Sequence, residues 1–269
     1  MVKKLFKHEA LAYIRTLLPM YLITLGIGLL TRFVYLFETN GTVFEIIGTS
    51  SIIAFIVACA VSLIMTFVNV VTRFYKNLFT HEGYLSFTLP VTGAQHIFVK
   101  LVSGIAAIVC AFIVVLVGIC IATAGEMTVE LFKALGYLIN YIKPHFEGHF
   151  WYYVVEFVIA IFVCLCMELL LFYGCIAVGQ LSNKNRVLSA IGVYFGYYFF
   201  TQLVGTILVL VANALIDTGF YTSILEFMEV HPLATIHIGF WLAIVWMSFL
   251  GLVYFLVTNY IIKKKINLE

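Results

Sequence analysis

The residues of this chain that could do chemistry lie mostly inside long apolar runs. Glu168 falls near the middle of the run 152–181, where an ionisable side chain is costly and often functional. It could neutralise a cationic substrate or carry a proton. It could equally be a protonated or hydrogen-bonded carboxyl that holds helices together, and the sequence leaves these alternatives open. Glu156, near one end of the same run, is expected to be in contact with water.

A second polar set lies on the run 187–216. Tyr194, Tyr198 and Gln202 recur every four residues and would therefore share one face of a helix. This stripe is a candidate lining for a translocation path, and ordinary packing of tyrosine between helices is the alternative. Gly192 and Gly196 form a G-x-x-x-G pair, which permits close approach of another helix and makes both glycines candidate helix–helix contacts.

The sequence lacks the signatures of membrane enzymes. Its one aspartate, Asp217, excludes an aspartyl intramembrane protease, and it has neither a serine-nucleophile elbow nor a phosphate-binding loop. His81 and Glu82 lack the second histidine of a zinc-protease motif, while a nearby proline and glycine interrupt the helix on which His145 and His149 would share a metal. We predict no catalytic residue, no metal site and no directly bound cofactor.

Membrane-spanning helices must position these residues. Of the 269 residues, 64% are hydrophobic and 10% charged, whereas a soluble domain has about 25% charged residues. Six runs are each long enough for a helix to cross a hydrocarbon core of about 30 Å. They are 17–37, 46–72, 101–125, 152–181, 187–216 and 238–262. We predict an all-α integral membrane protein whose residues 1–269 form a single transmembrane domain.

Basic residues are distributed unevenly between the two sets of connecting segments. Twelve lie in one set, which includes both termini and residues 73–100, and three lie in the other: Arg32, Lys133 and Lys143. Because Lys and Arg concentrate in cytoplasmic segments, both termini of this multi-pass protein are predicted to be cytoplasmic. A net charge of +2 gives no reason to expect a nucleic-acid partner.

Several shorter segments have helical signatures of their own. Residues 2–16 mix apolar and basic side chains and are expected to lie as an amphipathic helix along the inner membrane interface. A polar stripe within 130–143 predicts an interfacial helix on the outer side, and 217–235 is similar, with Pro232 breaking it. Thr92 and Gln95 predict a capping box at the start of the third span.

The segment 73–91, between the second and third spans, is the most informative part of the chain. It is predicted to be cytoplasmic, yet it carries aromatic and aliphatic side chains that solvated loops rarely combine, including Phe74, Phe79, Tyr84 and Phe87. Such a surface should be buried against a partner protein or at the membrane interface.

This segment resembles one in the six-helix membrane subunits of ABC exporters, permeases that work with a separate ATP-binding-cassette ATPase. The matching residues are Phe74-x-Lys76-Asn77-Leu78-Phe79-x-x-Glu82-Gly83-Tyr84-Leu85-x-x-Thr88-Leu89-Pro90-Val91, followed by Lys100-Leu101. Leu5-Phe6-Lys7-His8-Glu9 and Leu17-Leu18-Pro19-Met20-Tyr21 resemble the opening of the family, and Gly179-Gln180-Leu181 resembles its fourth-span exit.

The resemblance implies a permease subunit in the plasma membrane that exports a peptide, a lipid or an amphipathic toxin. ATP and Mg²⁺ would be bound by the partner ATPase, so the chain itself would not be an enzyme, and a second permease chain, identical or similar, would complete a dimer surrounded by membrane lipid. Carried over by position, the coupling helix that docks on the ATPase would include Lys76, Asn77, Leu78, Phe79, Glu82, Gly83, Tyr84 and Leu85.

Two other functions remain open from the residues alone. The chain could be a proton-coupled secondary transporter, for which Glu168 would carry the proton. It could also be a membrane sensor or assembly factor that transports nothing, with the aromatic segment binding some other protein.

Overall fold

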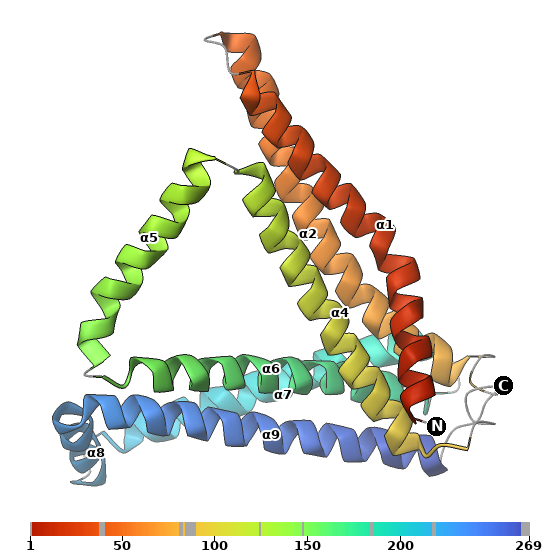
Figure 1. Ribbon diagram of the computed structural model, residues 1–269. Helices are drawn as coiled ribbons and strands as arrows, with labels where there is room; N and C mark the ends of the chain where they lie inside the picture. Colours follow the sequence, from red (N-terminus) through yellow and green to blue (C-terminus); the bar gives the residue numbers. More distant parts are fainter. Residues whose placement is uncertain are drawn as a thin grey trace. The chain divides into compact units, whose positions relative to one another are not determined.

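The computed structural model describes residues 2–37, 41–80, 83, 90–123, 125–146, 148–182, 185–216 and 219–264. These residues are almost entirely helical and contain no strand. The helices are α1 (Val2–Leu36), α2 (Thr42–Phe79), α4 (Gly93–Ala122), α5 (Glu126–Ile142), the 3₁₀ turn η1 (Lys143–Phe146), α6 (Phe150–Gly179), α7 (Arg186–Ala214), α8 (Gly219–Val230) and α9 (Pro232–Lys264) (Figure 1).

Six of these helices are long and apolar enough to cross a membrane: α1, α2, α4, α6, α7 and α9. This confirms the prediction of an all-helical chain with six helices that are long and apolar enough to cross a membrane. Several of them extend past the predicted spans, because polar residues at a membrane surface can continue a helix as well as apolar ones.

The N-terminal segment shows such an extension. Residues 2–16 are helical, as expected, but they continue without a break into the first span, and Pro19 lies inside α1. A proline in a helix removes one backbone hydrogen bond, and the helix is continuous on both sides of it. The placement of residues 2–16 along the membrane surface stays a prediction.

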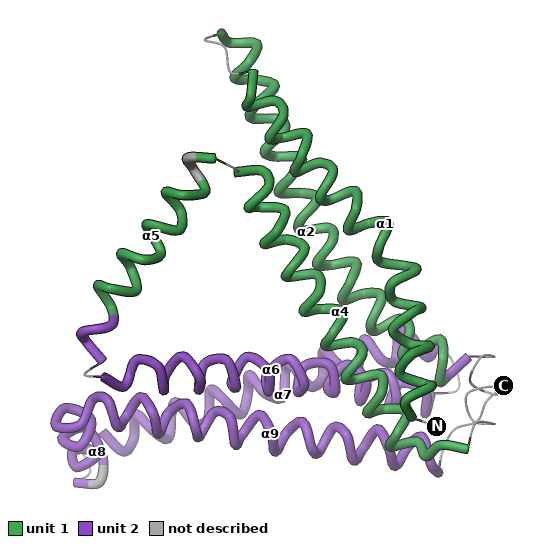
Figure 2. Tube along the Cα trace, viewed as in Figure 1, with its two compact units in different colours: residues 1–78, 82–142 green, residues 79–81, 143–269 purple. Residues whose placement is uncertain are grey.

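The chain packs as two compact units (Figure 2). Unit 1 comprises residues 1–78 and 82–142, and unit 2 comprises residues 79–81 and 143–269. Each unit is described by itself below, and the single transmembrane domain stays a prediction.

Unit 1 is held together by an aromatic ring that fits between two glycines. Phe55 of α2 is buried, and a Cβ atom added at Gly28 of α1 would lie 3.1 Å from its ring. A Cβ atom at Gly118 of α4 would lie 3.3 Å from the same ring. The two glycines therefore allow α1 and α4 to approach each other closely, with the Phe55 ring packed against both.

Hydrogen bonds join the same helices on either side of this ring. The hydroxyl oxygen of Tyr21 lies 2.9 Å from Oγ1 of Thr66 on α2 and 3.3 Å from the carbonyl oxygen of Ala107 on α4. Thr31 of α1 donates to the carbonyl oxygen of Ser51 on α2. The hydroxyl groups of Tyr21 and Thr31 are thus satisfied in part by neighbouring helices.

Unit 2 is built on α6, which packs against α9 and α7, while α8 packs against α9. At the end of α6, a Cβ atom at Gly179 would lie 2.7 Å from the backbone of Ala190 on α7, so only glycine fits there without displacing α7. Pro232 occupies the first position of α9, where its missing N–H needs no partner. The predicted break at Pro232 is therefore confirmed as a helix boundary.

Two local predictions concern α4 and α5. Thr92 and Gln95 form the predicted capping box: the Thr92 N–H donates to Gln95 Oε1 at 2.9 Å, and the Gln95 N–H donates to Thr92 Oγ1 at 3.4 Å. The segment with the polar stripe is helical, as α5, and its described side chains are exposed along nearly the whole helix. Its location at a membrane interface stays a prediction.

Candidate functional site

The most polar buried site in the described part of unit 1 is built around Glu9. One carboxylate oxygen of Glu9 accepts hydrogen bonds from Nζ of Lys100 at 2.7 Å and from Nδ2 of Asn77 at 3.1 Å. The other accepts from Arg73, at 3.0 Å from Nη2 and 3.3 Å from Nε. The guanidinium carbon of Arg73 also lies 5.1 Å from the centre of the Tyr13 ring, which attracts a cation. We call Glu9, Arg73, Asn77 and Lys100 the Glu9 cluster.

Three helices supply the Glu9 cluster, and each supplies a residue just outside its predicted span. Glu9 precedes the run that begins at residue 17, Arg73 and Asn77 follow the run that ends at 72, and Lys100 precedes the run that begins at 101. The cluster therefore lies where three spanning helices end on the same side.

Because Glu9 and Lys100 are buried, each of their charges needs a partner within the protein. Glu9 is 6% exposed and Lys100 is 4% exposed, so neither charge can be satisfied by water. Burial by itself raises the pKa of the Glu9 carboxyl, but the charges and hydrogen bonds of Lys100 and Arg73 outweigh it and hold the pKa below its ordinary value of 4.5. The carboxylate is therefore ionised at neutral pH and balances part of the two positive charges.

The Glu9 cluster has no acid–base or nucleophilic task that its geometry suggests. Its effect is mechanical, because one carboxylate links the N-terminal part of α1 to the end of α2 and to the start of α4. The end of α2 and the start of α4 flank the segment 80–92, so Glu9 is bonded to residues on both sides of this segment.

The predicted ATPase contacts differ in their surroundings. Among residues 76–79, Lys76 is exposed, the Asn77 side chain is turned toward Glu9, and Leu78 and Phe79 are buried. Gly83 is helical and buried. The remaining predicted contacts, Glu82, Tyr84 and Leu85, lie outside the described residues. Contact of this segment with an ATPase stays a prediction, and Lys76 is the exposed side chain through which residues 76–79 would make it.

Glu168 is half-buried on α6 in unit 2. It makes no hydrogen bond and no ion pair with any residue that the structure describes. Glu168 therefore does not join helices through a hydrogen bond to any described residue. Its role in a translocation path stays a prediction.

The aromatic stripe of α7 divides into a packed and an exposed part. Tyr194 stacks on Phe172 of α6, with ring centres 5.2 Å apart, which is the ordinary packing role considered above. Tyr198 and Gln202 are exposed, and Gln202 donates a hydrogen bond to the Tyr198 hydroxyl at 3.1 Å. The stripe does not converge on one cavity in the described structure, and a path lined by these residues stays a prediction.

The glycine pair of α7 faces away from the other described helices of unit 2. A Cβ atom at Gly192 or at Gly196 would meet nothing within 4 Å, and no residue of α7 is buried. The opposite side of α7 packs against α6 through Ala190 and Tyr194. If Gly192 and Gly196 contact a helix, that helix therefore lies outside the described part of unit 2.

Unit 2 contains a polar cluster that the sequence did not reveal. Glu156 is buried, 8% exposed, so the expectation that it is in contact with water is wrong. His237 Nδ1 lies 2.8 Å from both of its carboxylate oxygens, and Trp241 Nε1 donates to Oε1 at 3.0 Å. Tyr153 stacks on the His237 ring at 4.1 Å and donates its hydroxyl to the carbonyl oxygen of Leu233 at 2.7 Å.

The partners of Glu156 come from α9, about 80 positions later in the chain. Only the spacing of His237 and Trp241, four residues apart and thus on one helical face, could have indicated half of this cluster. The pairing itself depends on how α6 and α9 pack. Within the part of the chain that the structure describes, no group of three or more His, Cys, Asp or Glu side chains could hold a metal ion.

Comparison of the chain with protein-family models, with curated proteins and with solved structures finds no match. The likeness to the membrane subunits of ABC exporters therefore depends on the residues quoted from the sequence. What the chain does must be argued from those residues and from the geometry of the described helices.

Proposed function

We propose that the chain is the transmembrane permease subunit of an ATP-driven exporter of the ABC class. A separate ATPase would bind ATP and Mg²⁺, and a second permease chain, identical or similar, would complete the translocation path. The observation that carries the proposal is the Glu9 cluster, in which one buried carboxylate bonds Arg73 before the coupling segment, Asn77 at its start and Lys100 after it.

A coupling segment must move spanning helices when it is pushed. Because Glu9 bonds α2 before the segment and α4 after it, a displacement of residues 76–85 would be passed to α1, α2 and α4 together rather than absorbed by a flexible loop. Closure of the ATPases on ATP would then shift the spans between inward and outward access. A peptide, a lipid or an amphipathic toxin would be the exported substrate.

The other predicted residues take roles that agree with this proposal. Both termini and the coupling segment lie in the cytoplasm. Glu168, Tyr198 and Gln202 contribute to the path, while Gly192 and Gly196 face the second permease chain, a role supported by the empty space around both glycines.

The first test isolates the full chain from its native membrane in mild detergent. An ATPase subunit should copurify, and its turnover should be coupled to transport. Glu82→Ala/Tyr84→Ala should uncouple the two, whereas Glu226→Ala/Tyr221→Ala, which changes the same residue types on α8, should leave coupling intact. Absence of any ATPase, or equal effects of both double variants, would contradict the proposal.

The second test concerns orientation. Lys76 and Lys133 are both exposed, and the proposal places them on opposite sides of the membrane. A membrane-impermeant maleimide should label Lys76→Cys from the cytoplasmic side and Lys133→Cys from the outer side of intact cells. Labelling of Lys76→Cys from outside would place the coupling segment on the wrong side for an ATPase.

A second candidate function is a proton-coupled secondary transporter. It is favoured by Glu168, a half-buried carboxyl within a span that no described residue bonds. Transport by the purified chain in vesicles would then follow a pH gradient without an ATPase, and Glu168→Gln would abolish it. Under the exporter proposal, Glu168→Gln alters transport while ATPase recruitment is retained.

A further inference from the structure

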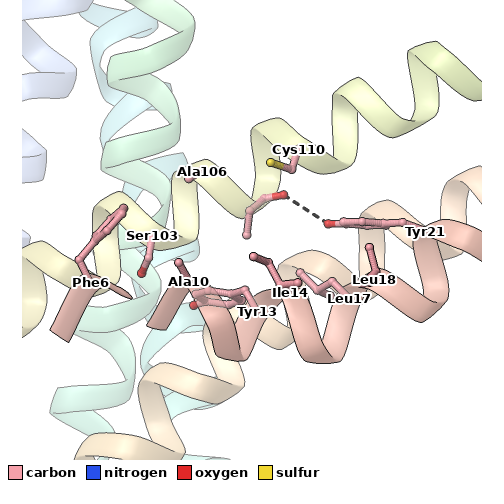
Figure 3. A pocket seen from close by; sticks show the side chains of 11 residues that line it. Phe6, Ala10, Tyr13, Ile14, Leu17, Leu18, Tyr21, Ser103, Ala106 and Cys110 are labelled. Carbon is pink, nitrogen blue, oxygen red and sulfur yellow. Dashed lines mark hydrogen bonds between the residues drawn. The ribbon is translucent and has the colours of Figure 1, made fainter. Parts of the chain in front are cut away.

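A cavity of about 310 Å³ lies in unit 1 between α1 and α4 (Figure 3), within the size range of ligand sites, about 300–1,000 Å³. Its walls are almost entirely apolar. Side chains from both helices surround it, among them Phe6, Ala10, Ile14 and Leu18 of α1 and Ala106 and Cys110 of α4. An occupant must therefore be apolar over most of its length.

Beyond one end of this cavity, the lining face of α1 carries two lysines. The lining residues of α1 recur every three or four positions, through Ala10, Ile14 and Tyr21, and so lie on one face of the helix. Continued toward the N-terminus, the same spacing reaches Lys7 and Lys3. Both lysines are exposed, and neither makes a hydrogen bond or ion pair with a residue that the structure describes.

The other end of the cavity is apolar and has no polar group in need of a partner. The Tyr21 hydroxyl, which lies there, is already bonded to the carbonyl oxygen of Ala107 (the dashed line in Figure 3) and lies 2.9 Å from Thr66 Oγ1. The face from Ala10 to Tyr21 is about 16 Å long at 1.5 Å per residue. That is close to half of a hydrocarbon core of about 30 Å, the depth of one lipid leaflet.

We propose that this groove binds one acyl chain of an anionic phospholipid and that Lys3 and Lys7 hold its headgroup phosphate. The charge at one end, the apolar walls and the length of the groove all match such a lipid. The chain would enter past Ala10 and reach toward Tyr21, while the headgroup stays beyond the level of the Glu9 cluster. The proposal does not depend on what the protein transports.

Native mass spectrometry of the full chain in mild detergent tests the headgroup. Phosphatidylglycerol and phosphatidylcholine with identical acyl chains are added in turn. The chain should retain one phosphatidylglycerol about 25-fold more strongly than one phosphatidylcholine, because each of the two lysines contributes about fivefold. Lys3→Gln/Lys7→Gln should remove this preference.

The matched control is Lys4→Gln/Arg15→Gln, which removes the same charge from the same helix at positions off the lining face. It should keep the preference for phosphatidylglycerol. If both double variants lose the preference equally, the attraction is general to the N-terminus and the assigned site is wrong. If neither loses it, the headgroup lies elsewhere.

A second variant tests the acyl chain independently of charge. Ala106 lines the groove and is exposed, so Ala106→Phe fills the space without disturbing a packed contact and should weaken retention of both lipids at least fivefold. Ala54→Phe, at an exposed position on α2, should not. Unchanged retention in Ala106→Phe would overturn the assignment of the groove.

Discussion

The carboxylate of Glu9 and the ammonium group of Lys100 lie 2.7 Å apart, although the residues are 91 positions apart in the chain. Both are almost fully buried, so each depends on the other for its solvation. This pair, with Arg73 on the second carboxylate oxygen, makes the start of α1 part of the same polar junction as the ends of α2 and α4.

Removing the charge of Glu9 should destabilise unit 1 strongly. Breaking a buried ion pair by changing one partner costs about 3–5 kcal/mol, because the other charge stays buried and unpaired, so Glu9→Gln should lower the free energy of unfolding in mild detergent by about 3 kcal/mol. Glu130→Gln, at an exposed position, should change it by less than about 0.5 kcal/mol.

The double variant Glu9→Gln/Lys100→Met separates pairing from packing. Lys100→Met removes the ammonium group that Glu9→Gln leaves buried without its carboxylate, so part of the lost stability should return. Arg73 is exposed enough to be solvated by water. If Glu9→Gln is as mild as Glu130→Gln, or the double variant is less stable than Glu9→Gln, the cluster is not held by this ion pair.

The stability that Glu9 contributes should depend on pH in one direction. Its pKa is lower in the folded chain than its ordinary value of 4.5, so the unfolded chain takes up a proton at this site first as the pH falls. The contribution is therefore fully present above about pH 5 and is lost progressively as the pH falls through the folded pKa. The difference in unfolding free energy between wild type and Glu9→Gln should be constant from pH 7 to 5 and shrink below pH 4.5; a gap that widens on acidification would contradict the ionised pair.

The six spanning helices were predictable because their signal is local: each is a run of apolar residues long enough to cross a membrane. The capping box at Thr92 was predictable for the same reason, since both partners lie within four residues. The Glu9 cluster and the Glu156 site were not, because their partners lie 64 to 91 and 81 to 85 positions away. Packing decides which helix faces meet. The sequence pattern of a single helix does not reveal which face of another helix it contacts.

Glycines illustrate the same limit. Gly192 and Gly196 have a recognisable spacing, yet no described residue of unit 2 approaches them. Gly28 and Gly118 have no motif, yet they flank Phe55. Spacing shows that a close approach is allowed, and only the positions of other helices show where it occurs.

Gly28 and Gly26 provide a matched pair on α1 for this packing. A Cβ atom at Gly28 would lie 3.1 Å from the Phe55 ring and 3.3 Å from the carbonyl oxygen of Gly118, while one at Gly26 would meet nothing within 4 Å. Gly28→Ala should lower the free energy of unfolding by about 1–3 kcal/mol through overpacking. Gly26→Ala should leave it unchanged or raise it by up to about 1 kcal/mol, because alanine favours the helix. Equal effects in thermal unfolding would mean that Phe55 does not occupy the space between the glycines.

The Glu156 site should respond to the loss of an acceptor. Glu156→Leu leaves His237 and Trp241 without their shared partner. A donor left unsatisfied in a buried site costs about 1–3 kcal/mol, and because His237 is half-buried and Trp241 is exposed, unfolding in detergent should become easier by about 1 kcal/mol. Glu156→Gln keeps one amide oxygen as an acceptor and should cost less than half as much, with Trp241 fluorescence closer to that of the wild type. Glu226→Leu, at an exposed position on α8, controls for the loss of a carboxylate and should be nearly neutral. If Glu156→Leu is also neutral, or Gln and Leu are equivalent, then the hydrogen bonds from α9 do not hold α6 in place, and the packing of their apolar side chains alone does so.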